Sequence, residues 1–586
     1  ITLTWPQYQD AGVLTIFFHK LSSNLEKISY ACLTLSTYLP ILEWLPNYKK
    51  EYLIPDIIAG VTVGLTAIAQ GIAYATIAGL PLEYGLYGSL TAGIIYMFFG
   101  RCIPLTIGPT AILSAVLTKY VSANYSPDFA ILVAFLSGLF ILILGVFNLG
   151  FLVEFISIPV ITGFTTAAAL QIAAAQLKSL FGTSGSSGNY FYESITIFFN
   201  NITTLKLWEP VLGFGTIILL MLFKKLGQGC KRTDGVVKKT RWFISLSRNA
   251  VVVVVGMIIA YLLKVTLDAE PIAIIGEIGS GLPEFTIPPF STMVGNETYS
   301  FIEMLQVLGV QSISIPFVAI LETVAIAKAF ADDGRIDASQ EMIAIGLCNI
   351  IGSFGQSMPI TGSFTRTALN HVSGVKTPAG GVTKVLLLIF ALTTLTSTFY
   401  YIPKASLAGL IITAMFTMID YDVVPKIWRS SLRDFVVLVL TTVACLISGL
   451  EYGIVAGILF EALILLFNIA RPKLDVYLTK AEKGDVIVVP LCENLSYCAA
   501  EHVRLKLLKA TLDLTTNLPI VIDGTKLRRL DYTGAFNLIS TIPILAKKHD
   551  VLLLNFNAVF KKKSGQPFCR NCVELSSVIY KIDVRF

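Results

Sequence analysis

The stretch MPITGSFTRTALNHV, residues 358–372, places a proline, hydroxyl side chains and an arginine between two long apolar segments. A second stretch with the same pattern, IPLTIGPTAILSAVL, occupies residues 103–117. Each joins a short extended piece to a helix that opens at a small or hydroxyl residue. Extended backbone at membrane depth is tolerated only inside protein or beside water, so two such breaks in corresponding halves predict a transporter binding site.

The composition of the whole chain predicts a membrane protein. Of its 586 residues, 54% are hydrophobic and only 14% are charged, which leaves too few polar groups to cover a water-soluble globule of this size. The alternation with period two that is typical of a membrane barrel is missing, so the apolar segments are predicted to be helices. We expect fourteen segments: 53–77, 84–100, 108–121, 129–147, 152–180, 210–225, 249–267, 301–331, 339–354, 363–373, 378–397, 405–418, 433–449 and 452–470.

The two broken segments, which start at 108 and 363, are too short to cross a bilayer, and they are the third and the tenth. A spacing of seven indicates two inverted repeats of seven segments. Helix N-termini expose unpaired N–H groups and a partial positive charge, so two of them facing each other favour an anion. Arg366 adds a permanent charge that can make paired hydrogen bonds with an oxyanion. Two roles stay open for Arg366, an electrostatic role at the anion and scaffolding of the broken helix.

The distribution of charge predicts the topology. The loop between the sixth and seventh segments carries eight lysines and arginines from 224 to 248 against one acid, which places it in the cytosol together with both chain termini. Three sequons follow odd-numbered segments, where this topology has the outside of the membrane, and are therefore expected to be glycosylated: Asn124, Asn201 and Asn296. The sequon at Asn494 falls on the cytosolic side and should stay unmodified.

From about residue 474 the pattern becomes that of a soluble domain. DVIVVPL (485–491), PIVIDG (519–524) and VLLLNF (551–556) are typical of strands, and AAEHVRLKLLKATL (499–512) is typical of an amphipathic helix. Alternating strands and helices predict a small cytosolic α/β domain. The expected organisation is a cytosolic N-terminal region (1–52), a transmembrane anion-transport domain (53–470) and this domain (471–586).

Enzymatic chemistry has little support in the sequence. The apolar region offers no nucleophile with a base, no metal cluster and no phosphate-binding glycine loop. The nine cysteines form no disulfide pattern, and Cys569 and Cys572 would need two further ligands to hold zinc. We expect no metal, no cofactor and no nucleic-acid partner.

The signature PDIIAGVTVGLTAIAQGIAYATIAGLPLEYGLYGSLTAGIIYMFFGRCIPLTIGPTAILS, residues 55–114, closely resembles that of the SulP sulfate permease family of anion transporters. ETVAIAKAFA (322–331), TGSFTRTALNHVSGVKTPAGG (361–381) and YYIPKASLAGLII (400–412) are most similar to the branch of sodium-independent sulfate anion transporters. VIDGTKLRRLDYTGAFNL (521–538) resembles the STAS domain. There are two departures from the family pattern. Ala69 replaces a proline, and GRCI replaces GTSR.

The resemblance implies a fold: an α-helical polytopic membrane protein with a 7+7 inverted repeat, a core domain that moves against a gate domain, and a small cytosolic α/β STAS domain. It also implies a homodimer held through STAS and N-terminal contacts. The anion site that it implies consists of Gln70, Tyr74, Thr110, Ala111, Glu322, Ser363, Phe364, Thr365 and Arg366. The first and eighth segments are equivalent under the repeat, so Gln70 and Glu322 are expected to face one another.

Several of these residues keep a second interpretation. Glu322 either carries a proton with the anion or pairs with Arg366. Tyr74 either lines the site or packs in the core, and Thr110 and Ser363 either bind the anion or only cap their helices. Three further residues are expected to lie outside the anion site. His371 packs beside it, and Lys328 and Lys384 extend to the membrane interface.

The function that follows is secondary transport of sulfate by alternating access, in the plasma or lysosomal membrane and in contact with its lipid. Chloride, oxalate or bicarbonate are the expected exchange partners, and symport with protons is the other coupling considered. Three alternatives remain: an uncoupled chloride channel, a voltage-driven membrane motor like the electromotile member of the SulP family, and a scaffold that binds soluble partners through the STAS domain.

Overall fold

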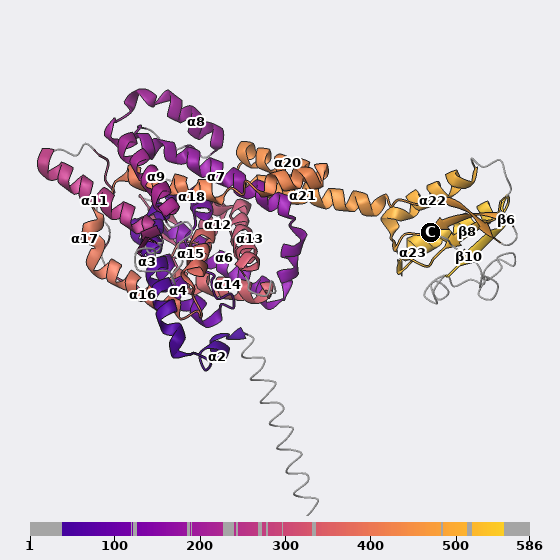
Figure 1. Ribbon diagram of the computed structural model, residues 1–586, viewed down its shortest axis with the longest axis horizontal. Coiled ribbons are helices and arrows are strands. Elements are labelled where there is room, and N and C mark those ends of the chain that lie inside the picture. The colour runs from indigo at the N-terminus through magenta and orange to yellow at the C-terminus, as the bar shows by residue number, and fades with distance from the viewer. Residues whose placement is uncertain are drawn as a thin grey trace, which may run out of the picture. The chain divides into compact units, whose positions relative to one another are not determined.

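The computed structural model describes residues 38–555, with the exception of 119, 121–125, 185–187, 189, 227–239, 242–243, 246, 268–271, 277–278, 280, 296, 331–335, 482–483 and 513–517. The chain divides into two compact units, Ile1–Ile458 and Leu459–Phe586. The larger unit is built from helices and the smaller one contains a four-stranded sheet (Figure 1).

The described part of the first half of the larger unit has a short strand and two 3-10 turns between its helices, one of them η2 (Ile202–Thr204). Its helices are α2 (Ile41–Trp44), α3 (Lys50–Ala78), α4 (Leu82–Phe99), α5 (Ala111–Leu117), α6 (Asp128–Val146), α7 (Ile158–Phe181), α8 (Phe191–Asn200), α9 (Trp208–Leu226) and α11 (Arg248–Leu267). The strand β1 (Ile107–Gly108) comes directly before α5, and the 3-10 turn η1 (Leu149–Phe155) comes before α7.

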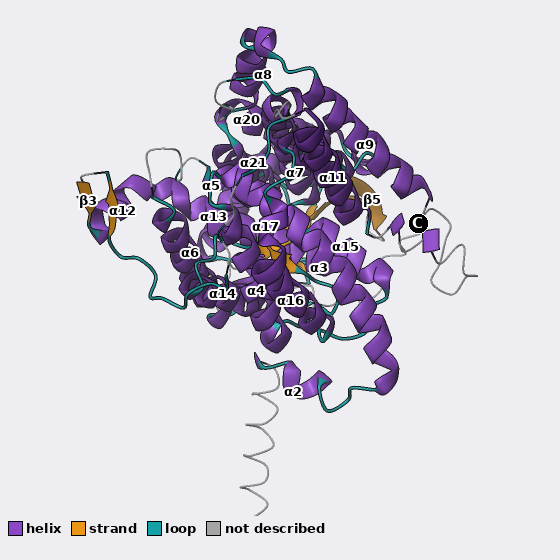
Figure 2. Ribbon diagram, turned by 90° about the vertical axis from the view of Figure 1, so that its left-hand side faces the viewer, coloured by secondary structure: helices purple, strands orange, loops and turns teal. Residues whose placement is uncertain are grey.

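The second half repeats the arrangement of a short strand before a short helix, with β4 (Thr361–Gly362) before α15. Its helices are α12 (Phe301–Leu308), α13 (Ser314–Phe330), α14 (Ala338–Phe354), α15 (Phe364–Ser373), α16 (Gly380–Phe390), α17 (Thr396–Phe399), α18 (Lys404–Met418), α19 (Val423–Ser430), α20 (Leu432–Ser448) and α21 (Leu450–Ala470). The hairpin of β2 (Thr292–Val294) and β3 (Glu297–Tyr299) precedes α12, and Figure 2 shows β3 beside that helix.

Apolar helices of sufficient length make this unit membrane-spanning. Within the described residues, six helical segments are long and apolar enough to cross a bilayer. The two helices predicted to be too short are indeed short, since α5 has seven residues and α15 has ten, against roughly 20 for a spanning helix.

The helices of this unit form two packed groups. In the first, α4 packs against α3, α14 and α16, and α16 packs against α3, with α15 against α3 and α6 against α14. In the second, α7 packs against α18 and α20, and α18 packs against α9 (Figure 1). The halves exchange partners within the first group, because α16 lies on α3 and α4 while α6 lies on α14 and α13. Such crossed packing is what an inverted repeat with a core and a gate domain predicts.

Small residues allow the helices of the first group to approach closely. A Cβ atom at Gly85 on α4 would lie 2.1 Å from the carbonyl oxygen of Gly71 on α3, so only glycine fits at this crossing. Helix α3 also runs without interruption through Ala69, where the family pattern has proline.

Two predicted segments are wrong as single helices: 152–180 begins in the 3-10 turn η1 and becomes α-helical only at Ile158, and 301–331 is divided at Gly309. Gly309 has a φ of 58° and ends α12, and a 3-10 turn, η3 (Val310–Ile313), leads into α13. Glycine reaches this conformation at no steric cost and commonly ends helices, while the apolar run continues through the break. Helices α8 and α19 lie outside the predicted segments because each is short and amphipathic and adds no long apolar run.

The smaller unit is an α/β domain. Its sheet has the order β10-β8-β6-β5, in which β6 (Gly484–Pro490), β8 (Ile520–Asp523) and β10 (Val551–Leu554) are parallel and β5 (Tyr477–Ala481) is antiparallel to β6. Helices α22 (Tyr497–Leu512) and α23 (Tyr532–Leu545) pack against each other, and a two-stranded pair joins β7 (Asn494–Leu495) to β9 (Arg529–Leu530). The three predicted strands and the predicted helix are therefore present.

Candidate functional site

Strands β1 and β4 bring the two broken helices together. They pair antiparallel, with Ile107 opposite Gly362 and Gly108 opposite Thr361. The pair continues into the helix starts, where the backbone N–H of Ser363 donates to the carbonyl of Thr106 at 3.0 Å. Helices α5 and α15, far apart in the sequence, therefore begin at the same place.

Thr110 and Ser363 are the N-cap residues of α5 and α15. Both have extended backbone, and neither side chain makes a capping hydrogen bond. The first N–H groups of a helix have no partner within the helix, so the N–H groups of Phe364 and Thr365 stay available to a ligand. The interpretation of Thr110 and Ser363 as simple caps loses its support.

A cavity of about 350 Å³ lies at these helix starts, between the two helix groups. Seven of the nine predicted site residues line it: Tyr74, Thr110, Ala111, Glu322, Ser363, Phe364 and Thr365. The facing wall was missed by the sequence analysis and comes from α7 and the end of α18: Ile161, Thr162, Phe164, Thr165, Met415, Thr417, Met418, Ile419 and Asp420. The stretch TGFTT, residues 162–166, is rich in hydroxyl groups, but such a stretch does not by itself indicate a cavity wall.

Arg366 and Gln70 do not line the cavity and lie behind the helix starts. The Arg366 side chain is completely buried. Its Nη2 donates to the carbonyl of Pro109 at 2.8 Å and its Nη1 donates to Oε1 of Gln70 at 3.2 Å. Nε2 of Gln70 in turn donates to Oγ1 of Thr365 at 3.2 Å. The guanidinium therefore connects α3, the end of β1 and α15.

Glu322 lies at the other helix start. Its Oε2 accepts a hydrogen bond from Oγ1 of Thr110 at 3.1 Å, and the residue is half-buried on the cavity wall. Gln70 of the first segment thus contacts the start of α15, while Glu322 of the eighth contacts the start of α5. Within the described residues no hydrogen bond joins Gln70 to Glu322, and no ion pair joins Glu322 to Arg366. The contact of Gln70 with α15 and the contact of Glu322 with α5 are thus equivalent under the repeat that relates the two halves of the chain.

Buried polar groups fix β4 in place. Oγ1 of Thr361 donates to the carbonyl of Ala319 at 2.7 Å, and the N–H of Gly362 donates to Oγ1 of Thr323 at 3.0 Å. The side-chain amide of Asn349 makes two hydrogen bonds to the backbone of Ile360, each of 2.9 Å. The extended backbone is therefore satisfied by α13 and α14 rather than by water.

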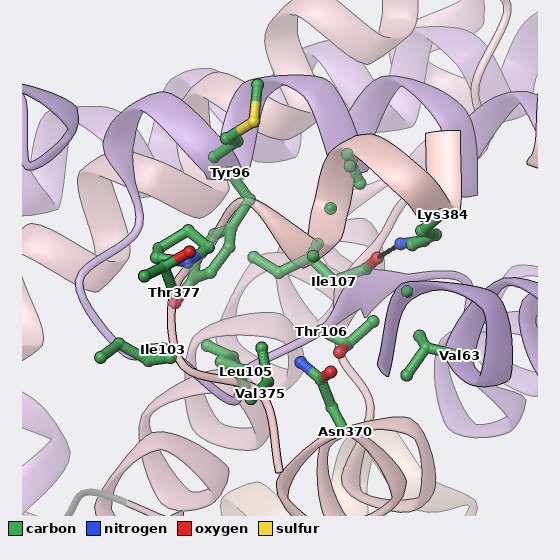
Figure 3. A pocket seen from close by; sticks show the side chains of 17 residues that line it. Val63, Tyr96, Ile103, Leu105, Thr106, Ile107, Asn370, Val375, Thr377 and Lys384 are labelled. Carbon is green, nitrogen blue, oxygen red and sulfur yellow. Dashed lines mark hydrogen bonds between the residues drawn. The ribbon is translucent and has the colours of Figure 1, made fainter. Parts of the chain in front are cut away.

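Lys384 was expected to extend to the membrane interface, and that expectation is wrong. Its side chain is buried on α16, and its Nζ donates to the carbonyl of Ile107 in β1 at 3.0 Å (Figure 3). Because α16 packs on α3 and α4, a lysine on its inner face cannot reach the interface. Lys328 is exposed at the end of α13, and His371 packs its ring on Phe330 with centroids 5.7 Å apart.

Only some of the predicted surface sites fall on described residues. Asn201 follows α8, and its Nδ2 donates to the carbonyl of Ile197 at 3.0 Å. Asn124 and Asn296 lie outside the described residues, as do most of the cationic loop and the pair Cys569 and Cys572.

Comparison with known proteins assigns the chain to a family. The sequence model of the sulfate permease family matches residues 53–441. The chain belongs to the sulfate permease family. The sodium-independent sulfate anion transporter of Bos taurus is 39% identical over 518 residues, which are 86% of this chain and 84% of that protein. A probable sulfate permease of Schizosaccharomyces pombe is 33% identical over 451 residues, which are 75% of this chain and 50% of the length of that protein.

A solved structure of SLC26A9 shares the fold. It aligns with a TM-score of 0.78 at 22% sequence identity, covering 96% of this chain and 93% of that chain. This sulfate permease family member is thus an integral membrane protein with the fold of an anion transporter. Its GRCI turn, residues 100–103, is held by Glu341, whose Oε1 accepts from the N–H groups of Arg101 at 3.1 Å and Cys102 at 2.9 Å.

Proposed function

We propose that the protein is a secondary transporter that moves sulfate and related small anions across a membrane by alternating access. One observation carries this proposal: the starts of α5 and α15 meet at the β1–β4 pair beside a cavity that lies between the two helix groups. The names of the relatives from Bos taurus and Schizosaccharomyces pombe agree with it.

The chemistry of the cavity suits a tetrahedral oxyanion. The N–H groups of Phe364 and Thr365 and the partial positive charge of the α15 start favour negative charge. The hydroxyl groups of Ser363 and Thr365 can donate to further oxygens of the same ion, and that of Thr110, which donates to Glu322 in this structure, can do so once Glu322 carries a proton. Tyr74, Ala111 and the ring of Phe364 supply the apolar remainder of the wall, which limits competition from water.

Arg366 acts on the anion from behind the helix starts. Arg366 does not line the cavity, so its contribution is a fixed charge together with its hydrogen bonds to Pro109 and Gln70. The electrostatic and scaffolding roles are therefore compatible. A buried guanidinium without a carboxylate in contact leaves the region positive, which an incoming anion neutralises.

Glu322 is proposed to carry the proton that accompanies sulfate. A carboxylate on the cavity wall opposes a dianion, and protonation removes that repulsion. The alternative role, pairing with Arg366, has no support from the contacts, since Glu322 contacts Thr110 and Arg366 contacts Pro109 and Gln70.

The place of the cavity supports alternating access. The predicted site residues lie on α3 and α15 of the first group and on α5 and α13, which pack against α3 and α14 of that group, and the opposite wall belongs to α7 and α18. A sliding of the first group against the second would carry the anion from one side of the membrane to the other while its hydrogen bonds stay in place.

The remaining assignments are proposals that rest on family membership. Residues 53–470 form the transport domain, 471–586 form a cytosolic STAS domain, and 1–52 precede them in the cytosol. We propose a homodimer held by the STAS domain and the N-terminal region, both termini in the cytosol, and a location in the plasma or lysosomal membrane. Exchange against chloride, oxalate or bicarbonate is the alternative to proton symport.

Uptake of radiolabelled sulfate into proteoliposomes, with and without an inward proton gradient, tests the proposal. We expect saturable uptake that accumulates sulfate when the inside is alkaline. Anion currents far above transporter turnover would indicate a channel instead. A gating-like charge movement with no net flux would indicate a membrane motor, and both of these outcomes would reject the proposed function.

A further inference from the structure

Lys384 is a buried cation that the proposed transport cycle does not use. Its side chain is 4% exposed, and it makes no ion pair within the described residues, where the three ion pairs all involve other groups. Ionisable side chains at membrane depth are costly, and their presence there points to a function.

Lys384 and Arg366 hold the same short strand. Nζ of Lys384 donates to the carbonyl of Ile107, and Nη2 of Arg366 donates to the carbonyl of Pro109, two residues later. At roughly 3.3 Å per residue of extended chain, these acceptor carbonyls lie about 7 Å apart. Thr110, the first residue of the chain to line the cavity after this strand, follows Pro109 directly. Two positive charges therefore stand behind the start of α5.

A second, smaller cavity lies beside the Lys384 side chain. It measures about 40 Å³ and is lined by Lys384 together with Thr106 and Asn370 (Figure 3). A water molecule needs roughly 10–15 Å³ of space for its centre, so this cavity has room for about three. An ammonium has three donors, and the contact with Ile107 uses one. The cavity leaves room beside the ammonium for water to accept from the other donors.

We propose that Lys384 determines the charge specificity of the anion site by supplying the second positive charge that matches a divalent oxyanion. The proposal rests on the proposed function of the cavity. Arg366 alone would balance a monovalent anion, whereas Arg366 and Lys384 together balance sulfate. Glu322 adds no opposing charge when it carries its proton. Lys384 acts through its field and through its hold on β1, and is a positioning and specificity residue rather than a ligand of the anion.

A charge and a simple anchor have different consequences for two anions. The electrostatic energy of an ion at a given position scales with its charge. Sulfate carries twice the charge of chloride. If removing the charge of Lys384 weakens chloride binding by a factor f, it should therefore weaken sulfate binding by f squared. A lysine that only anchored the carbonyl of Ile107 would weaken both by a similar factor.

The test is anion binding to the purified full chain, with sulfate measured by calorimetric titration and chloride by its competition against sulfate. Lys384→Gln keeps an N–H donor and removes the charge, so a loss of about tenfold for chloride should accompany a loss of about a hundredfold for sulfate. Lys384→Arg keeps the charge and should preserve the parent ratio of the two affinities. Lys328→Gln, at an exposed lysine, is the matched control and should leave both affinities unchanged.

Equal losses for both anions, or no loss for either, in a folded Lys384→Gln protein would overturn the assignment of Lys384. Lys384→Met also removes the donor to Ile107, which adds an equal loss for both anions, so it should still weaken sulfate binding more than chloride binding; it is measured if the glutamine variant does not fold. A parent protein that binds no sulfate would overturn the proposed function as well. A parent that binds sulfate, with variants that lose both affinities equally, would overturn only the inference about Lys384.

Discussion

Replacing Arg366 by methionine should weaken sulfate binding severely while the protein still folds. Methionine fills much of the buried volume but removes the charge and the donors to Pro109 and Gln70. The site would keep its cavity wall, because Arg366 does not line it.

The size of the effect follows from the position of the guanidinium. It contacts the carbonyl of Pro109, directly before Thr110, and Arg366 is the third residue of α15, so its charge lies about 8 Å from an anion held at the two helix starts. At an effective dielectric constant of about 20, the attraction for a dianion is about 4 kcal/mol. This corresponds to roughly a thousandfold loss in sulfate affinity and about thirtyfold for chloride.

Stability must be measured beside affinity. The methionine leaves the carbonyl of Pro109 and Oε1 of Gln70 without these donors, at a cost of about 1–3 kcal/mol for each buried acceptor. Size-exclusion profiles and thermal unfolding in detergent establish folding, and calorimetric titration gives the sulfate affinity. Arg101→Met is the matched control, since that side chain is half-exposed and, among the described residues, its one ion pair is a 3.9 Å contact with Glu43.

Arg366→Lys separates charge from geometry, because it keeps the charge but offers a single ammonium for two acceptors. It should recover much of the sulfate affinity that methionine loses. A folded Arg366→Met protein that binds sulfate as tightly as the parent would refute the reasoning. A loss of equal size for sulfate and chloride would also contradict it, since it would indicate scaffolding without an electrostatic role.

Three further predictions address coupling, packing and topology. Sulfate uptake into proteoliposomes by the parent should rise as the external pH falls. The Glu322→Gln variant should still bind sulfate but lose this pH dependence. If a folded variant kept the pH dependence, Glu322 would not be the proton site, and proton coupling would have to be assigned to His371 or given up. Gly85→Ala should destabilise the protein by about 1–3 kcal/mol through overpacking against Gly71, seen as a lower melting temperature, whereas Gly215→Ala, with open space around it, should not. Enzymatic deglycosylation should shift the protein on a gel, and no shift should remain after glutamine replaces all three sequon residues, Asn124, Asn201 and Asn296.

The broken helices were predictable because their signal is local. Proline and β-branched residues before a hydroxyl residue indicate an extended piece and a helix start wherever they occur, and both starts appear at Thr110 and Ser363. The pairing of the two pieces with each other joins residues far apart in the sequence. Only the repeat spacing and the family resemblance indicated it. The grouping of seven predicted residues around one cavity agrees with that resemblance.

The missed features depend on packing that no short pattern encodes. A lysine near the end of an apolar run looks the same whether its helix faces lipid or another helix, so the burial of Lys384 could not be predicted. The α7 wall of the cavity was missed for the same reason, since Thr162 and Thr165 become site residues only when α7 lies opposite α15. The break at Gly309 was missed because its apolar neighbours continue the hydrophobic run.

The most direct measurement is a structure of the protein determined in saturating sulfate. We predict tetrahedral density in the cavity between the starts of α5 and α15, within hydrogen-bonding distance of the N–H groups of Phe364 and Thr365 and of Oγ1 of Thr110. A preparation that transports sulfate, but whose structure shows this cavity without sulfate and the ion bound elsewhere, would contradict the assignment of the site.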